Sequence, residues 1–131
     1  MRIAQGLIDE VVSHAREDVP NECCGMVGGI DGEARTVYRA ENAEASPLRY
    51  SIDANEQFRL MREIEEAGEE LVGIYHSHTK SAAYPSQTDV NLAGWPDAVY
   101  LIASLADSKV PDVKGFWIRD GEIADAELVV E

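Results

Sequence analysis

The chain has 131 residues, of which 45% are hydrophobic, and this predicts one globular domain, residues 1–131, with a core of its own. Eleven basic against 25 acidic residues give a net charge of −14, and such a surface repels phosphate backbones, which disfavours binding to nucleic acid. No apolar run approaches a membrane span, and Asp9 and Glu10 interrupt any signal-like stretch, so we expect a cytoplasmic protein that does not bind membranes.

A helix and a hairpin are predicted first. Apolar residues recur at helical spacing from Leu7 to Ala15, and Pro20 prevents this helix from continuing far. The Asp31-Gly32 pair is a hairpin turn signal between two predicted strands, residues 24–30 and 35–40.

A loop and a second helix follow. Residues 41–54 are expected to be mostly loop, with a short extended piece at 50–52. Asn55 is typical of a helix N-cap, and the apolar spacing after it predicts a helix that ends near Gly68. The continuously apolar segment 71–75 indicates a buried central strand.

The last third of the chain predicts one short helix and three strands. Ser86 begins the helix, and Gly94 and Pro96 stop it. The strands, the last two joined by a turn, are expected at residues 99–104, 113–119 and 123–130. Helices therefore alternate with strands, and hairpins are expected to close both ends of the sheet, which predicts a mixed α/β sandwich rather than a purely parallel sheet.

The two cysteines, Cys23 and Cys24, are adjacent in the sequence. Neighbouring residues of a strand point to opposite faces, so these two thiols are poorly placed to form a disulfide with each other. This pattern fits a reducing compartment, and it favours two small residues packed in the interior over a reactive thiol.

Residues 76–89 contain a pattern typical of a metal site: His-x-His, seven residues, then Ser-x-x-Asp. His76 and His78 lie two apart at the end of a predicted strand, so they share a face and their ring nitrogens can converge on one ion. The loop allows the next helix to bring Asp89 back to them. Two imidazoles and a carboxylate can bind one zinc ion and leave its fourth position open, as in hydrolytic zinc sites.

Two other residues have a plain structural interpretation beside a functional one. Ser86 with Asp89 is also an ordinary helix start, a role compatible with ligation. Glu22 precedes an apolar, glycine-rich strand, and such a glutamate is usually solvated. A zinc hydrolase needs a base that is not a ligand, and Glu22 is the candidate for it. His14, in the polar part of the first helix, is expected at the surface.

These residues resemble the JAMM (MPN+) metalloprotease family, whose signature is a glutamate on the first strand, then His-Ser/Thr-His, seven residues and Ser-x-x-Asp. Glu22, His76, His78, Ser86 and Asp89 match that signature with no departure in spacing. The resemblance implies a cytidine-deaminase-like α/β fold, a mixed sheet sandwiched between helices. It also implies one Zn²⁺ held by His76, His78 and Asp89, with Glu22 and Ser86 as the catalytic residues. The zinc signatures of cytidine deaminases themselves are absent.

Within the family, residues 75–79 and 83–89 are most similar to small actinobacterial enzymes that cut cysteine from a sulfur carrier. That likeness implies a partner of the ubiquitin-like type, a CysO-like sulfur-carrier protein ending in Gly-Gly, and hydrolysis of the amide bond between its last glycine and a cysteine. Only seven residues separate His78 from Ser86, which disfavours the insertions that larger relatives use to grip polyubiquitin. The sequence leaves two other functions open, a peptidase that trims other carrier extensions and a non-catalytic binding module. It also leaves open whether the protein forms a homodimer.

Overall fold

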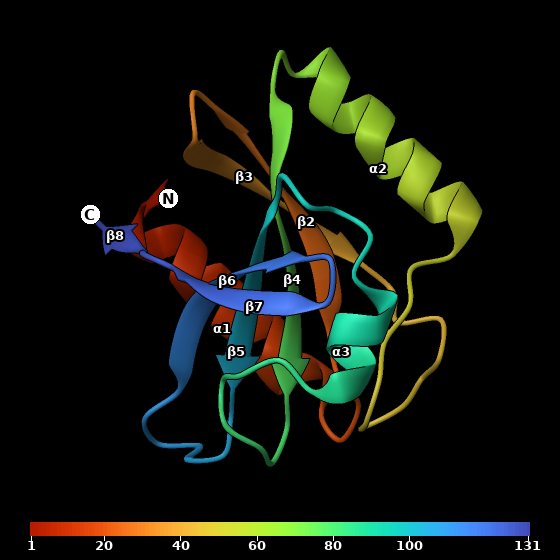
Figure 1. Cartoon of the computed structure of the whole chain (residues 1–131), viewed down its shortest axis with the longest axis vertical. Helices are drawn as coiled ribbons and strands as arrows, with labels where there is room; N and C mark the ends of the chain where they lie inside the picture. The colour runs from red at the N-terminus through yellow and green to blue at the C-terminus, as the bar shows by residue number, and fades with distance from the viewer.

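One eight-stranded mixed sheet forms the centre of the computed structural model, which describes residues 1–131 (Figure 1). The strands are β1 (Arg2–Ile3), β2 (Cys24–Ile30), β3 (Glu33–Ala40), β4 (Glu70–His78), β5 (Val99–Ser104), β6 (Asp112–Arg119), β7 (Glu122–Ala126) and β8 (Val129–Val130). The helices are α1 (Gln5–Asp18), α2 (Ala54–Glu66) and α3 (Gln87–Leu92). In the sheet the order is β7-β6-β5-β4-β2-β3-β1-β8. At its middle, β4 runs parallel to β5 and antiparallel to β2.

The helices cover opposite faces of this sheet. On one face α1 buries Ile8, Val11 and Ala15 in a cluster with side chains of β2, β4 and β5. On the other face α2 buries Leu60 and Ile64 against the same three strands. Full burial of an aliphatic side chain of this size stabilises the fold by about 1.5–3 kcal/mol. The predicted mixed α/β sandwich is therefore confirmed. None of the helices is long and apolar enough to span a bilayer.

The sheet curls until its two edges are close together. β7 lies at one edge and ends at Ala126, whereas β8 lies at the other edge and begins at Val129, so only two residues connect the edges. The amino group of Met1 donates a 2.7 Å hydrogen bond to the carbonyl of Glu127 in this connection. Both chain ends consequently lie side by side, as Figure 1 shows.

Three predictions about secondary structure need correction. The N-cap of α2 is Asp53, whose side chain accepts a hydrogen bond from the amide of Asn55, because the helix begins at Ala54, two residues earlier than an N-cap at Asn55 predicts. Residues 50–52 form no strand. The predicted last strand, 123–130, is two strands at opposite edges of the curled sheet, so the β2–β3 hairpin lies inside the sheet and not at its end. Gly68 does adopt a positive φ of 73° just after α2, as expected for a helix stop.

The cysteines behave as predicted. Cys23 and Cys24 are both free and fully buried, and they belong to the clusters on opposite faces of the sheet. Burial disfavours the charged thiolate and raises the pKa of both thiols, that of Cys23 to about 12. Neither thiol is therefore a nucleophile at neutral pH.

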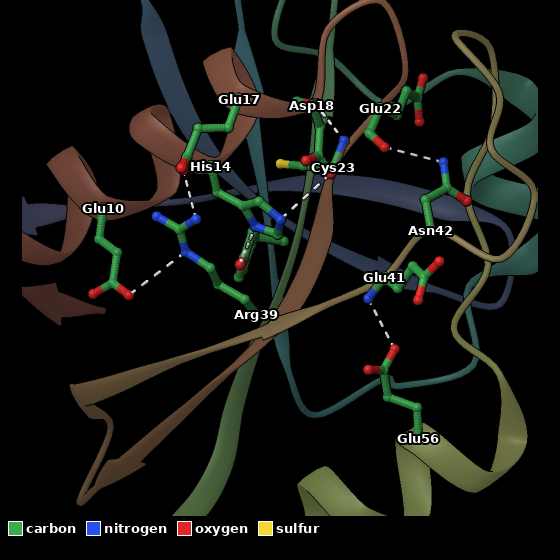
Figure 2. A network of polar contacts seen from close by, with 12 residues as sticks. Glu10, His14, Glu17, Asp18, Glu22, Cys23, Arg39, Glu41, Asn42 and Glu56 are labelled. Carbon is green, nitrogen blue, oxygen red and sulfur yellow. Dashed lines mark hydrogen bonds and ion pairs between the residues drawn. The ribbon is translucent and has the colours of Figure 1, made fainter.

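His14 is not at the surface, contrary to the expectation. It is only 5% exposed, and its Nδ1 lies 2.7 Å from the hydroxyl of Tyr75 on β4. Its Nε2 lies 3.4 Å from the carboxylate of Asp18 on the next turn of α1 (Figure 2). Desolvation lowers the pKa of His14, so the ring is neutral at pH 7 and serves as a polar anchor between α1 and the sheet.

Gly25→Ala is expected to destabilise the protein by about 1–3 kcal/mol, because cores tolerate added atoms poorly. Gly25 pairs with Tyr75 across β2 and β4, and a Cβ at Gly25 would overlap the phenol ring. The ring cannot move freely because His14 holds its hydroxyl. Gly6→Ala, in α1 with nothing within 4 Å, is the control and is expected to stabilise by about 0.5–1 kcal/mol. Urea denaturation checks both, and equal stability of the two variants would refute this packing argument.

Candidate metal centre and its cleft

The candidate site lies where the carboxyl ends of β4 and β5 meet the amino end of β2. His76 and His78 end β4, and strand alternation puts both rings on the face that carries α2. His76 is fully buried and His78 is 4% exposed. Asp89, 7% exposed, lies in the first turn of α3, so the loop between β4 and α3 brings the carboxylate back as predicted.

Three donor atoms converge at this point. Asp89 Oδ2 lies 3.0 Å from His76 Nε2 and 3.0 Å from His78 Nε2, and the two nitrogens lie 3.2 Å apart. Ligand atoms about 2.0–2.1 Å from a tetrahedral ion are themselves about 3.3–3.4 Å apart. The three atoms therefore have nearly the mutual spacing of metal ligands, and they form a candidate metal-binding group.

The protonation of His78 also suits a metal ligand. Its Nδ1 lies 2.8 Å from the carbonyl oxygen of Ala82, which can only accept, so Nδ1 carries the proton and donates it. When the ring is neutral, Nε2 presents a lone pair to the group. In the metal-free protein burial by itself would lower the pKa of His78, but the hydrogen bond between its Nε2 and Asp89 outweighs burial and raises that pKa, so the ring takes up a proton that a metal would displace. Burial lowers the pKa of His76. Burial by itself would raise the pKa of Asp89, but hydrogen bonds with the two histidines outweigh it and hold that pKa below its ordinary range.

Asp89 and Ser86 fix each other at the start of α3. The amide of Asp89 donates to Ser86 Oγ at 3.0 Å, and the amide of Ser86 donates to Asp89 Oδ2 at 2.9 Å, a complete capping box. The structural and functional interpretations of this pair thus coincide. Because Ser86 Oγ accepts this bond, its own hydroxyl proton is free to donate elsewhere.

Hydrogen bonds hold the backbone of Glu22, which lines the same cavity as Ser86. Its amide donates to Ser46 O at 2.9 Å, and its carbonyl accepts from Asn42 Nδ2 at 3.0 Å (Figure 2). The next amide, that of Cys23, donates to Ser77 Oγ at 2.8 Å. Ser77, between the two histidines, therefore fixes the position of Glu22 relative to them.

The carboxylate of Glu22 is buried without a protein partner. The residue is 3% exposed, and its Oε1 has no hydrogen bond. An unpaired buried carboxylate oxygen is costly, so such a group in a cleft is a candidate for function. Burial raises the pKa of Glu22 to about 7, with His78 opposing and Asp89 adding to that effect. A carboxyl group with this pKa can take up and release a proton near neutral pH.

Tyr50 is a site residue that the sequence did not reveal. Its ring stacks on His76, with ring centroids 4.5 Å apart and planes 21° from parallel. His76 Nδ1 is buried and has no hydrogen-bond partner, so stacking takes the place of the hydrogen bond that usually orients a ligating imidazole. Asn42 was missed as well. Its side chain joins Glu22 to the loop that carries Tyr50 by donating to Arg49 O at 3.1 Å and accepting from the amide of Ser51 at 3.3 Å.

Tyr50→Ala is expected to weaken metal affinity by about 10- to 100-fold, the usual effect of removing an outer partner of a ligand. The reason is that His76 would lose the contact that orients its ring. Tyr50→Phe keeps the ring and serves as the matched control. Competition with a chromophoric chelator measures the affinities. If Tyr50→Ala binds the metal as tightly as the unmodified protein, the stacking does not orient His76.

A cleft of about 640 Å³ opens above these groups. Glu22, His78 and Ser86 are three of the residues that line it. The lining also includes Val19, Pro20, Pro47 and Leu48, which are mostly apolar, and the consecutive residues Thr79, Lys80 and Ser81, which we call the polar wall of the cleft. The structure therefore brings together all five residues that the sequence singled out, three of them in one cleft.

The arrangement is that of a hydrolytic metal centre, three converging donors beside a carboxylate that is not one of them. The chain belongs to the JAB-domain family, because the sequence model of the family described as prokaryotic homologs of the JAB domain matches residues 4–119. The resemblance to the JAMM (MPN+) family is thereby confirmed.

Similar proteins agree with this assignment. The chain is 42% identical over 130 residues to the CysO-cysteine peptidase of Mycobacterium tuberculosis, covering 98% of this chain and 89% of that protein. It is 43% identical over 112 residues to a desampylase of Haloferax volcanii, covering 79% and 80%. A solution structure from Desulfitobacterium hafniense superposes with a TM-score of 0.91 at 34% identity, covering 100% and 93%. The protein is accordingly a hydrolase of the JAMM peptidase type.

Proposed function

We propose that this protein is a zinc-dependent peptidase that hydrolyses the amide bond between the C-terminal glycine of a ubiquitin-like sulfur-carrier protein and a cysteine, releasing the cysteine. One observation carries the proposal: the converging group of His76, His78 and Asp89 beside the buried, unpaired carboxylate of Glu22. The substrate follows from similarity, since the relative covering 98% of this chain is a CysO-cysteine peptidase.

The donor set fits zinc. Two imidazole nitrogens and one carboxylate oxygen are the ligand types of catalytic zinc sites, which leave one position open. Zinc bound there would supply a Lewis acid that makes water a nucleophile near pH 7 and polarises a carbonyl oxygen. His76, His78 and Asp89 would hold it, and the backbone around them is fixed by β4 and by the capping box.

Glu22 is the proposed general base. Its carboxylate lines the cleft but is not part of the converging group, so it is free to accept a proton from an attacking water. The same carboxyl group can then give that proton to the departing amine of cysteine. Its raised pKa suits both transfers.

Ser86 is the proposed oxyanion donor. Ser86 lines the cleft, and its free hydroxyl proton can be donated to the carbonyl oxygen as negative charge develops there. A single donor of this kind is worth about 10²–10³ in kcat. A carrier tail of glycines has no side chains on the carbonyl side of the scissile bond, which allows it to lie close to Glu22, His78 and Ser86.

A second candidate function is cleavage of carriers attached to lysine side chains of other proteins. The desampylase of Haloferax volcanii, 43% identical over 112 residues, favours it. Both reactions hydrolyse an amide at the end of a carrier, so the metal centre alone does not separate them.

The test offers the zinc-loaded protein two substrates in one tube: a Gly-Gly-ending carrier with a C-terminal cysteine, and the same carrier joined to a lysine side chain. Intact-mass spectrometry follows both. The proposal predicts loss of one cysteine from the first substrate, with the second cut more slowly. Faster cleavage of the lysine conjugate would support the second function, and cleavage of neither would overturn both.

A further inference from the structure

The polar wall of the cleft, residues 79–81, is held rigidly next to the metal centre. The carbonyl of Ser81 accepts a 2.6 Å hydrogen bond from Ser104 Oγ, and the carbonyl of Ala82 accepts from the ring of His78. In the sequence, Lys80 lies between His78 and the two anchored residues, Ser81 and Ala82. Because two peptide units span at most about 7 Å, the Cα of Lys80 is within about 7 Å of the Cα of His78. The backbone at Lys80 is therefore fixed, while its side chain is exposed and lines the cleft.

Lys80 has no carboxylate partner in a protein that carries many. Acidic residues outnumber basic ones 25 to 11, and most basic side chains form ion pairs with them: Arg2, Arg35, Arg39, Arg49, Arg59, Arg62 and Lys114. Lys80 forms none, and it is the only basic residue that lines the cleft. A lone cation in the cleft of a protein with a net charge of −14 is suited to an anionic group of the substrate.

The chemistry of the leaving group supplies such an anion. When the bond that is cut joins a carrier to a free amino acid, the scissile nitrogen is bonded to the Cα that carries the terminal carboxylate. That carboxylate carbon lies only about 2.5 Å from the scissile nitrogen. A lysine side chain of another protein presents no charge at this place. The four-carbon stem of Lys80, which starts two residues after His78, can bring its ammonium group over this position.

We infer that Lys80 binds the free carboxylate of the released residue and so selects carriers that end in a single amino acid over carriers joined to protein side chains. The hydroxyls of Thr79 and Ser81, which line the same wall, are additional donors for that carboxylate. This inference rests on the proposed function and deepens it, because it assigns the choice between the two candidate reactions to one residue.

The experiment compares two carriers that differ in one group: a carrier ending in glycyl-cysteine with a free carboxylate, and the same carrier ending in cysteine carboxamide. The zinc-loaded protein is expected to cut the acid with a kcat/KM about tenfold higher, mostly through a lower KM, because a charge-assisted hydrogen bond is lost with the amide. Lys80→Gln is expected to cut the two at nearly equal rates.

Lys109→Gln is the matched control, since Lys109 is an exposed lysine that forms no ion pair and lies outside the cleft. It is expected to keep the tenfold preference. If the unmodified protein cuts both substrates equally, or if Lys80→Gln still prefers the acid, the inference about Lys80 is wrong while the proposed function stands. If the unmodified protein cuts neither substrate, the proposed function fails and this inference fails with it.

Discussion

Glu22→Gln should lower kcat for carrier–cysteine hydrolysis by about 10²–10⁴-fold, the usual contribution of a general acid–base group. The amide keeps the shape of the side chain but cannot accept the proton of water. Because Glu22 lies outside the group formed by His76, His78 and Asp89, the variant should still hold one zinc per chain. Single-turnover rates from intact-mass spectrometry and zinc content by inductively coupled plasma mass spectrometry check the two halves of this expectation.

The same variant has an expected effect on stability. In the metal-free protein, burial raises the pKa of Glu22 from 4.5 to about 7, so the unfolded state releases this proton at lower pH than the folded state does. Folding stability should therefore fall as the pH rises from about 4.5 to about 7. Glu22→Gln has no carboxyl group to ionise, so it does not lose stability over this pH range. At pH 8 the metal-free variant should therefore melt at a higher temperature than the unmodified protein. If the zinc analysis shows instead that Glu22→Gln has lost its metal, Glu22 is a ligand and not the general base.

Asp89→Ala should have the second large effect, on metal retention and activity together. Removing one of three ligands should weaken zinc affinity by more than the roughly 10- to 100-fold that an outer partner is worth. The variant also loses the capping box, since the amide of Ser86 no longer has its acceptor at 2.9 Å, at a cost of about 1 kcal/mol to the start of α3.

Asp89→Asn separates these two contributions. Its amide oxygen can still accept from Ser86 and keep the helix start, but the negative charge that favours a cation is gone. Zinc analysis of both variants after gel filtration should show metal loss in each, with the stability loss larger in Asp89→Ala. Full zinc occupancy in Asp89→Ala would remove Asp89 from the ligand set.

Much of the fold was predictable because local signals decide it. The apolar strands at 24–30 and 99–104 begin and end where the sequence predicts, since a strand buried on both faces is a continuous apolar run. The division of 123–130 into β7 and β8 was not predictable in this way. It depends on the curl of the sheet, which brings distant edges together and belongs to the tertiary structure.

The site shows the same division between local and distant information. The spacing of His76 and His78 on one strand indicates convergence directly, and the capping box accounts for Asp89. Tyr50 and Asn42 were missed because their contacts, to His76 and Glu22, join residues 26 and 20 positions away without any periodic pattern. His14 was misplaced for a similar reason: its partner Tyr75 lies 61 residues along the chain.

Zinc-edge anomalous diffraction from crystals of the zinc-loaded protein tests the central claim most directly. We predict one metal peak per chain, about 2.0–2.2 Å from His76 Nε2, His78 Nε2 and Asp89 Oδ2, with the carboxylate of Glu22 unbonded to it. A peak at another place, or a zinc bonded to Glu22 in place of one of these three residues, would contradict the assignment of ligands and base.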